Sequence, residues 1–376
     1  MKLSWMLSSA LMLASAAYGG DQGVTPTEIR LGASQVLSGP LGSQTVQYGE
    51  GARLMFDSVN AAGGVHGRKI SFTSLDDGFD VKRALENTRK LLDDEKVFML
   101  FNSTGTAQTA AVLPMLKEAK TILFGPVTGA SGLRETYNPY VFHVRASYAI
   151  EASHMLSQLN RIGVERVALF YQDDGLGKAL LAEVQKAAEA EGLPLVAVVK
   201  SDPAAPDMAA AASAIAEASP QAVIVGTAGM TFTNFIKAVQ STNTHPVFYG
   251  FSVASLDLIN NQLKGKARGI ILAQIMPSLR NTTIPVVVEY LKVLKAKSPK
   301  AVPSASQFEG FVHARLLVEG LRRTGRDLST DAFIKAMEDS KEIAFGRFTA
   351  QYSAKSHKGS SYVELAIIDA QGRLRY

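Results

Sequence analysis

The chain has 376 residues, of which 47% are hydrophobic and 19% charged, and it contains no cysteine. This composition is that of a globular protein with room for two domains, and it excludes disordered, collagen-like and coiled-coil chains. The formal net charge of +5 is spread along the sequence, without the block of basic and aromatic residues that a nucleic-acid surface needs. Without cysteine, neither a disulfide nor a lipid-anchored N-terminus is expected.

The first 20 residues have the pattern of a cleavable signal peptide. Met1-Lys2 gives a short positive start, Leu3 to Leu13 is an apolar run too short to span a bilayer, and Ala14 to Gly19 offers small residues for cleavage. No later apolar run approaches the ~20 residues that a membrane-spanning helix requires. We therefore expect export to the periplasm.

Strands and helices alternate along the rest of the chain. A strand at Glu28 to Gln35 precedes a helix that ends at Gly63-Gly64, and a strand at Ile70 to Leu75 precedes a helix at Val81 to Leu92. The same order starts again near residue 148. This alternation predicts an α/β fold with two right-handed, doubly wound lobes, each built on a parallel sheet.

Two small, hydroxyl-rich loops follow two buried strands. Val97 to Phe101 leads into a loop at Asn102 to Thr106, and Thr121 to Phe124 leads into a loop at Gly125 to Ala130. In open α/β sheets, ligands lie beyond the carboxyl ends of strands, where a helix start carries roughly half a positive charge. The two loops therefore predict a site for a small anion, such as a carboxylate, with ordinary caps and turns as the alternative.

Several short motifs follow one another along the chain: Ser38-Gly39-Pro40, VNAAGGVHGRKI (59–70), Asp76-Asp77, RKLLDDEKVFMLF (89–101), GPVTGA (125–130), YVFHVRASY (140–148) and LFYQDDGLGK (169–178). Their order and spacing resemble those of a known family, the type I periplasmic binding proteins of the leucine/isoleucine/valine-binding group. The resemblance covers essentially the whole chain after the signal peptide. It implies two lobes joined by three hinge crossings, a monomer that closes on a ligand in the cleft, and delivery of that ligand to the membrane permease of an ATP-driven importer.

The resemblance also implies where the lobes divide. The signal peptide is residues 1–20, the first lobe is residues 24–144 plus 276–345, and the second lobe is residues 145–275 plus 346–376. The crossings are expected near 143–147, 273–278 and 344–347. A single strand is expected over Phe345 to Tyr352.

A set of ligand-binding positions is likewise implied. The first-lobe loops would hold a ligand carboxylate through hydroxyls and backbone amides. Hinge packing is an alternative role for Tyr148, and helix-start packing is an alternative for Leu176. The implied positions are Gln44, Asn102, Ser103, Thr104, Val127, Thr128 and Gly129 in the first lobe, and Tyr148, Leu176, Thr227, Phe251 and Ser252 toward the second.

One loop departs from the amino-acid-binding pattern. Members that bind amino acids typically place an acidic residue in the loop that here reads Tyr249 to Val253, where it accepts the α-ammonium group, but this loop has no carboxylate. A buried ammonium group without a carboxylate partner costs several kcal/mol. We therefore expect a carboxylic acid without an α-ammonium group, aromatic or branched. The alternatives are a branched-chain amino acid, with Asp173 or Asp174 holding the ammonium group, and a sensor subunit of a membrane signalling protein.

Enzymatic functions have less support. The pairs Asp76-Asp77 and Asp173-Asp174 could supply a general acid and base, but adjacent loop residues usually point in different directions, and such pairs are common in turns and caps. The six histidines lack metal-ligand spacing, and neither a dinucleotide fingerprint nor a nucleophile elbow is present. We expect no catalytic residue, metal or cofactor.

Overall fold

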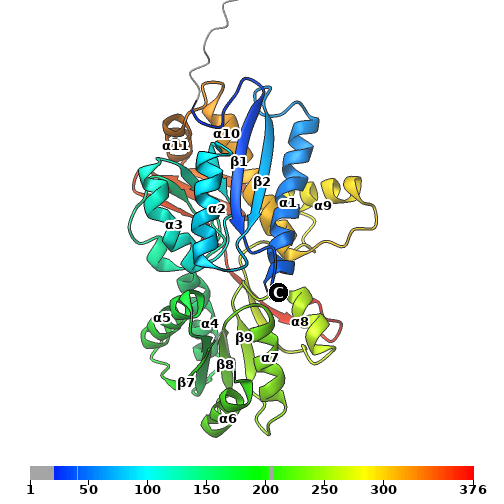
Figure 1. The fold of residues 1–376 in the computed structure, drawn as a ribbon. Coiled ribbons are helices and arrows are strands. Elements are labelled where there is room, and N and C mark those ends of the chain that lie inside the picture. The colour runs from blue at the N-terminus through cyan, green and yellow to red at the C-terminus, as the bar shows by residue number, and fades with distance from the viewer. Residues whose placement is uncertain (1–20, 40, 203–206) are drawn as a thin grey trace, which may run out of the picture.

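The computed structural model describes residues 21–39, 41–202 and 207–376, so the predicted signal peptide lies outside the described residues. Figure 1 shows two α/β lobes stacked end to end, with α1 to α3 and α9 to α11 in one and α4 to α8 in the other. The predicted α/β class with two lobes and parallel sheets is confirmed. No helix among the described residues is long and apolar enough to cross a membrane.

The first lobe is built on a parallel sheet in the order β2-β1-β3-β4-β5. β3 and β4 are fully buried apolar runs, as expected of central strands covered by helices on both faces. They are neighbours, so the loops that follow them lie side by side, and Thr104 and Val127 form a parallel bridge between these loops. The elements are β1 (Glu28–Gln35), α1 (Gly42–Ala61), β2 (Lys69–Asp76), α2 (Val81–Asp93), β3 (Met99–Phe101), α3 (Thr106–Glu118), β4 (Ile122–Phe124), a 3₁₀ turn (Ser131–Leu133) and β5 (Val141–Phe142).

The second lobe repeats the pattern around a larger sheet in the order β15-β14-β10-β9-β8-β6-β7. Strands β6 to β10 run parallel, and β14 and β15 are added antiparallel at one edge. The elements are α4 (Tyr148–Arg161), β6 (Val167–Gln172), α5 (Gly175–Ala190), β7 (Leu195–Ser201), α6 (Met208–Ala218), β8 (Ala222–Gly226), α7 (Gly229–Gln240), β9 (Val247–Gly250), α8 (Leu256–Leu263), β10 (Ile271–Gln274), β14 (Glu364–Ile368) and β15 (Leu374–Arg375).

Three helices return to the first lobe: α9 (Pro285–Lys297), α10 (Ala305–Thr324) and α11 (Thr330–Asp339). α10 lies along α1, and two glycines allow the close approach. A Cβ on Gly51 of α1 would collide with the Gln307 carbonyl, and a Cβ on Gly310 of α10 would collide with the Tyr48 carbonyl. This contact places residues of α10 directly behind the ligand-facing side of α1.

A small antiparallel sheet follows, made of β11 (Glu342–Phe345), β12 (Phe348–Ser353) and β13 (Ser356–Gly359). Residues 344–347, expected at a crossing, instead include the β11–β12 turn, where Gly346 has a φ of 82°. The expected strand over 345–352 is therefore two strands of a hairpin. Because the His143 amide donates to the His357 carbonyl beside β5 (2.9 Å), this sheet belongs with the first lobe, and we propose that the third crossing lies at 360–363.

Candidate ligand-binding cleft

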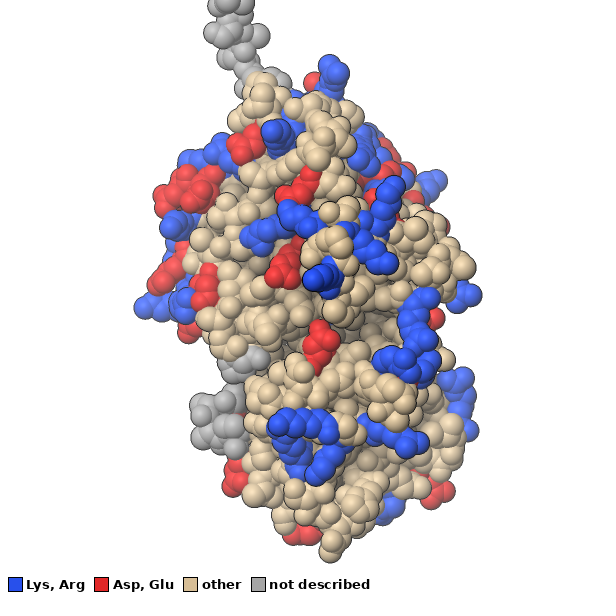
Figure 2. Space-filling model, turned by 90° about the vertical axis from the view of Figure 1, so that its right-hand side faces the viewer, with Lys and Arg blue, Asp and Glu red and all other residues tan. Residues whose placement is uncertain are grey.

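A cavity of about 40 Å³ lies between the lobes. Figure 2 shows the furrow between the lobes on one face of the molecule, with side chains of both charges scattered over the surface. The lobes are in contact, because Gln47 Nε2 on α1 donates to Asp257 Oδ2 on α8 (3.4 Å), and a Cβ on Gly175 would lie 2.9 Å from the Ala107 Cβ. The lining residues are Leu41, Gln44, Thr45, Tyr48, Phe79, Thr104, Gly105, Thr106, Val127, Tyr148, Leu176, Ala228 and Val253.

Helix α3 begins at this cavity without a cap. Its N-cap residue, Gly105, has a φ of 102° and offers no side chain, and the amides of Thr106, Ala107 and Gln108 have no acceptor among the described residues. These amides carry the partial positive charge of the helix start. The first-lobe wall of the cavity therefore presents unused hydrogen-bond donors that suit an anion.

Three of the helices that start at the cavity are uncapped. Seven helices are capped by the side chain of the residue before them, and of these α4 and α5 also reach the cavity, through Tyr148 and Leu176. The caps are Asp80 for α2, Ser147 for α4, Asp174 for α5, Asp207 for α6, Ser255 for α8, Ser304 for α10 and Ser329 for α11. α1, α3 and α7 lack such a cap, and their N-cap residues, Leu41, Gly105 and Ala228, all line the cavity. The remaining uncapped helix, α9, starts with proline, which has no amide hydrogen.

The two aspartate pairs are engaged in turns and caps. Asp174 Oδ1 accepts from the Gly177 amide (2.9 Å), and Asp173 forms ion pairs with Lys178 and Lys200, both at 3.0 Å. Neither Asp173 nor Asp174 lines the cavity. Among the described residues, no group of histidine, aspartate and glutamate is placed to hold a metal ion.

Five of the predicted ligand positions line the cavity: Gln44, Thr104, Val127, Tyr148 and Leu176. The other seven lie behind it. Asn102 Oδ1 contacts His313 Nδ1 (2.6 Å), Ser103 Oγ is buried without a partner among the described residues, and Thr128 Oγ1 shares a hydrogen bond with Thr106 Oγ1 (2.8 Å).

The remaining four predicted positions pack against other side chains. Gly129 packs under the Tyr148 ring, and Phe251 meets that ring edge-on with centroids 5.8 Å apart. Thr227 donates to Gln172, and Ser252 donates to Glu151.

The sequence prediction missed five lining residues: Leu41, Thr45, Tyr48, Phe79 and Val253. Gly105 and Thr106 belong to the loop predicted at 102–106, and Ala228 was expected beside Thr227. Tyr48 lies one helical turn after Gln44, which donates to its hydroxyl (3.0 Å), so the helical period was a usable signal for it. For Phe79 no such signal existed, because a turn conformation decides where its side chain points.

A buried charge cluster around Arg145 connects the lobes. The Arg145 side chain is fully buried; its Nε lies 3.6 Å from Glu309 Oε1 on α10 of the first lobe, and its Nη2 donates to Ser252 Oγ (2.5 Å) of the second. Ser252 in turn donates from its amide (2.7 Å) and its hydroxyl (2.8 Å) to Glu151 on α4. Arg145 thus bridges a carboxylate of one lobe to a hydroxyl of the other.

Burial controls the protonation of this cluster. Burial raises the pKa of Glu309 and of Glu151, and the charge of Arg145 opposes both shifts. Burial, followed by the charge of Arg145, lowers the pKa of His313 to about 3, so its imidazole is neutral near pH 7. A neutral His313 holds Asn102, at the start of the first-lobe loop, without adding charge behind the cavity.

The second-lobe wall of the cavity is mainly apolar. It consists of Leu176, Ala228 and Val253 together with Tyr148 at the start of α4, and no carboxylate side chain is among the lining residues. Glu151 lies close behind, but its oxygens face the Ser252 loop. The arrangement can bind an anionic group at the first lobe and an apolar group at the second.

Comparisons with known proteins agree with this architecture. Leu/Ile/Val-binding protein homolog 3 of Brucella melitensis is 21% identical over 354 residues, which cover 92% of this chain and 90% of that protein. A substrate-binding periplasmic protein from Ralstonia solanacearum has a solved structure with a TM-score of 0.86 at 29% identity, covering 92% of this chain and 99% of that one. The fold is shared by a fatty acid ABC transporter substrate-binding protein from Thermomonospora curvata (TM-score 0.82, 18% identity, covering 94% of this chain and 91% of that one).

The family model described as periplasmic binding protein matches residues 28–373, nearly the whole chain. The names of these relatives describe binding proteins. The chain belongs to the periplasmic binding protein family.

Proposed function

We propose that this chain captures a small carboxylic acid without an α-ammonium group in the interlobe cleft. In this proposal it works in the periplasm and delivers the acid to the permease of an ATP-driven importer. The observation that carries the ligand class is the asymmetry of the cavity wall. The start of α3, whose first three amides are free, reaches the cavity at Gly105 and Thr106, and the other side lacks any carboxylate.

The energetics favour an acid over an amino acid. Hydrogen bonds to a charged group are worth about 1.5–3 kcal/mol each, and donors that are already oriented do not lose conformational entropy on binding. An ammonium group placed against Leu176, Ala228 and Val253 would lose its water without gaining a carboxylate partner, which costs several kcal/mol. The same wall accepts an aliphatic or aromatic group at no such cost.

A branched-chain amino acid is the second candidate, and the position of Glu151 favours it. This buried carboxylate lies against the loop after β9, next to the place where amino-acid-binding members carry an acid. Its oxygens already accept from the Ser252 amide and hydroxyl, and it does not line the cavity. An ammonium group would have to displace these contacts before it could use Glu151.

Calorimetry on matched ligand pairs tests the ligand class. The pairs are leucine with 4-methyl-2-oxopentanoate, and phenylalanine with phenylpyruvate, which differ only in the group that replaces the α-amine. We expect at least one keto acid to bind more tightly than its amino acid, and a keto acid at a hundred times its Kd to stabilise the fold by about 2.7 kcal/mol. If only the amino acids bind, the branched-chain alternative replaces this proposal.

Delivery is tested separately with membrane vesicles that contain the cognate permease. We expect ATP-dependent uptake of the bound acid only when the purified protein is added. Tight binding without any stimulated uptake would favour the sensor alternative over the importer.

A further inference from the structure

The turn after β2 holds an aromatic residue in a backbone conformation that large side chains avoid. Gly78 and Phe79 have φ values of 57° and 67°, and the Asp80 amide donates to the Asp77 carbonyl (2.9 Å), which closes a β-turn over these two residues. The other non-glycine residues with positive φ in the described chain are asparagine, histidine, serine or lysine. A phenylalanine at such a position is a genuine conformational outlier.

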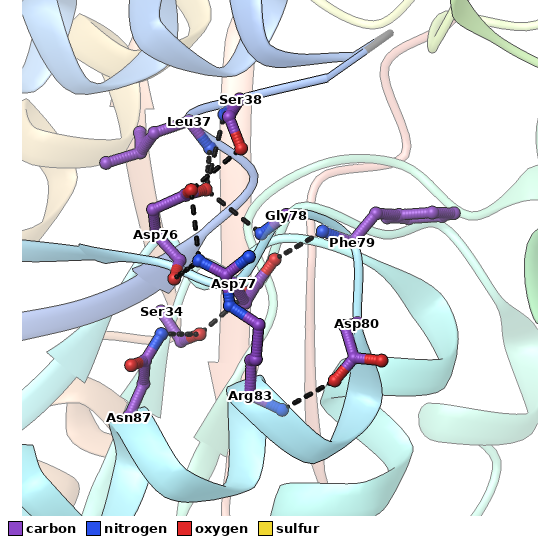
Figure 3. Close-up of polar contacts among 10 residues, drawn as sticks. All are labelled: Ser34, Leu37, Ser38, Asp76, Asp77, Gly78, Phe79, Asp80, Arg83 and Asn87. Atoms are coloured by element: carbon purple, nitrogen blue, oxygen red, sulfur yellow. Dashed lines mark hydrogen bonds and ion pairs between the residues drawn. The ribbon is translucent and has the colours of Figure 1, made fainter.

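The surrounding structure holds this turn firmly in place (Figure 3). Asp76 Oδ1 accepts from the amides of Leu37 (2.9 Å), Ser38 (3.2 Å) and Gly78 (2.9 Å), which ties the turn to the end of β1. Although desolvation opposes the shift, hydrogen bonds from the Ser38 hydroxyl and from the amides of Gly78 and Leu37, together with the charge of Arg83, lower the pKa of Asp76 to about 2. The turn is therefore fixed by an ionised carboxylate.

Contacts to Phe79 itself complete the support. Its amide donates to Asp77 Oδ1 (2.9 Å), and Asp77 is fully buried, with Oδ2 accepting from Ser34 Oγ (2.7 Å). Its carbonyl accepts from Gln108 Nε2 (2.7 Å), and Gln108 lies in the first turn of α3, where the free amides are. Phe79 is thus held at a fixed position relative to the predicted anion site.

The Phe79 ring serves no visible packing role that would explain the strain. Figure 3 shows it directed away from the polar contacts of the turn, and it lines the cavity together with Tyr48 and Tyr148. The residue is partly exposed, and among the described residues it forms no ring pair with another aromatic side chain. Strained residues that the surrounding structure over-determines occur mainly at functional sites.

We infer that Phe79 is a specificity-determining residue that contacts a planar ring of the ligand, and that the ligand class is aromatic carboxylic acids. The inference rests on the proposed function, because the ligand carboxylate at the start of α3 sets where its ring lies. An offset or edge-to-face contact with Phe79 favours an aromatic ring over an aliphatic group of similar area.

Two substitutions separate a ligand contact from a structural role. Phe79→Leu keeps most of the apolar area but removes the π system, so phenylpyruvate should bind about three- to tenfold more weakly, with 4-methyl-2-oxopentanoate much less affected. Phe79→Asn suits a positive φ, so the melting temperature should stay the same or rise while phenylpyruvate affinity falls at least as far. Lys264→Asn, at the exposed left-handed end of α8, is the matched control and should leave affinity unchanged.

Each outcome of calorimetry and thermal unfolding decides the inference. It is overturned if Phe79→Asn lowers the melting temperature and leaves phenylpyruvate affinity intact, because Phe79 is then a packing residue. It is also overturned, with the proposed function standing, if the wild-type protein binds 4-methyl-2-oxopentanoate but no aromatic acid. If the wild-type protein binds leucine and no carboxylic acid lacking the amine, the proposed function fails and this inference fails with it.

Discussion

The two walls of the cleft are built on different principles. The first-lobe wall is polar and fixed in advance: α3 starts with free amides, the loops after β3 and β4 are bridged at Thr104 and Val127, and the 76–80 turn is held by two carboxylates. The second-lobe wall is mainly apolar, made of Leu176, Ala228 and Val253 with the ring of Tyr148. The difference teaches that the first lobe can orient a ligand by itself, whereas the second lobe adds buried area when it closes.

The largest expected effect comes from breaking the bridge between the two walls. Arg145→Met leaves Glu309 and Glu151 buried without a cation and should lower the free energy of unfolding by about 3–5 kcal/mol, measured by urea unfolding. Arg145→Lys keeps the charge and should lose less. Lys297→Met removes an exposed ion pair with Asp57 and should cost no more than about 1 kcal/mol. Equal midpoints for Arg145→Met and wild type would contradict the bridge.

The next effect concerns the polar wall alone. Replacing both Ser103 and Thr104 with alanine removes hydroxyls beside the predicted carboxylate position and should weaken keto-acid binding at least about tenfold in calorimetry. Thr227→Ala, which removes a hydroxyl bound to Gln172 behind the apolar wall, is the control and should change affinity little. If the double variant keeps full affinity, these hydroxyls do not hold the carboxylate, and the free amides at the start of α3 are left as its proposed ligands.

The third test makes the apolar wall resemble that of an amino-acid binder. Ala228→Asp places a carboxylate at the uncapped start of α7, so 4-methyl-2-oxopentanoate should bind about tenfold more weakly. The ratio of leucine affinity to keto-acid affinity should therefore rise. Ala228→Asn offers the same cap without the charge and should shift the ratio far less. An unchanged ratio in Ala228→Asp would show that this wall does not contact the α-substituent.

The last test concerns a pH dependence of stability that comes from the support behind the polar wall. Because the folded pKa of His313 is about 3, below its usual 6.5, the unfolded chain takes up a proton below pH 6.5 that the folded chain does not. Stability should therefore fall as pH decreases from 6.5 toward 3, by at most about 1.4 kcal/mol per pH unit for this group. His313→Gln should flatten the slope of melting temperature against pH between 7 and 5, and an unaltered slope would assign the dependence to other groups.

Local sequence patterns predicted much of this fold. Alternating strands and helices predicted the two sheets, and small residues after the apolar runs at 97–101 and 121–124 predicted the loops whose bridge lines the cleft. The hairpin at 342–353 had a signal in Gly346, but the apolar run around it is also compatible with one longer strand. Periodicity was therefore informative wherever one face of an element is buried.

Other parts of the site leave no local trace. Arg145 and Glu309 are separated by more than 160 residues, and their ion pair depends on where α10 lies relative to the segment that carries Arg145. The direction of Phe79 depends on two consecutive positive φ values, which the sequence Asp-Asp-Gly-Phe-Asp permits but does not require. Long-range approach and rare backbone conformations are thus where prediction from sequence stops.

The glycine contact between α1 and α10 bears on how this cleft can diversify. α1 supplies Gln44 and Tyr48 to the cavity. Because Gly51 of α1 and Gly310 of α10 each lie against the backbone of the other helix, α1 has no room to slide or tilt. A lineage that adopts a new ligand can reshape this side by exchanging side chains on α1, while the path of the helix is inherited unchanged. Larger or smaller ligands would then be accommodated mainly by how far the second lobe rotates, so closure angle rather than first-lobe shape should vary among its descendants.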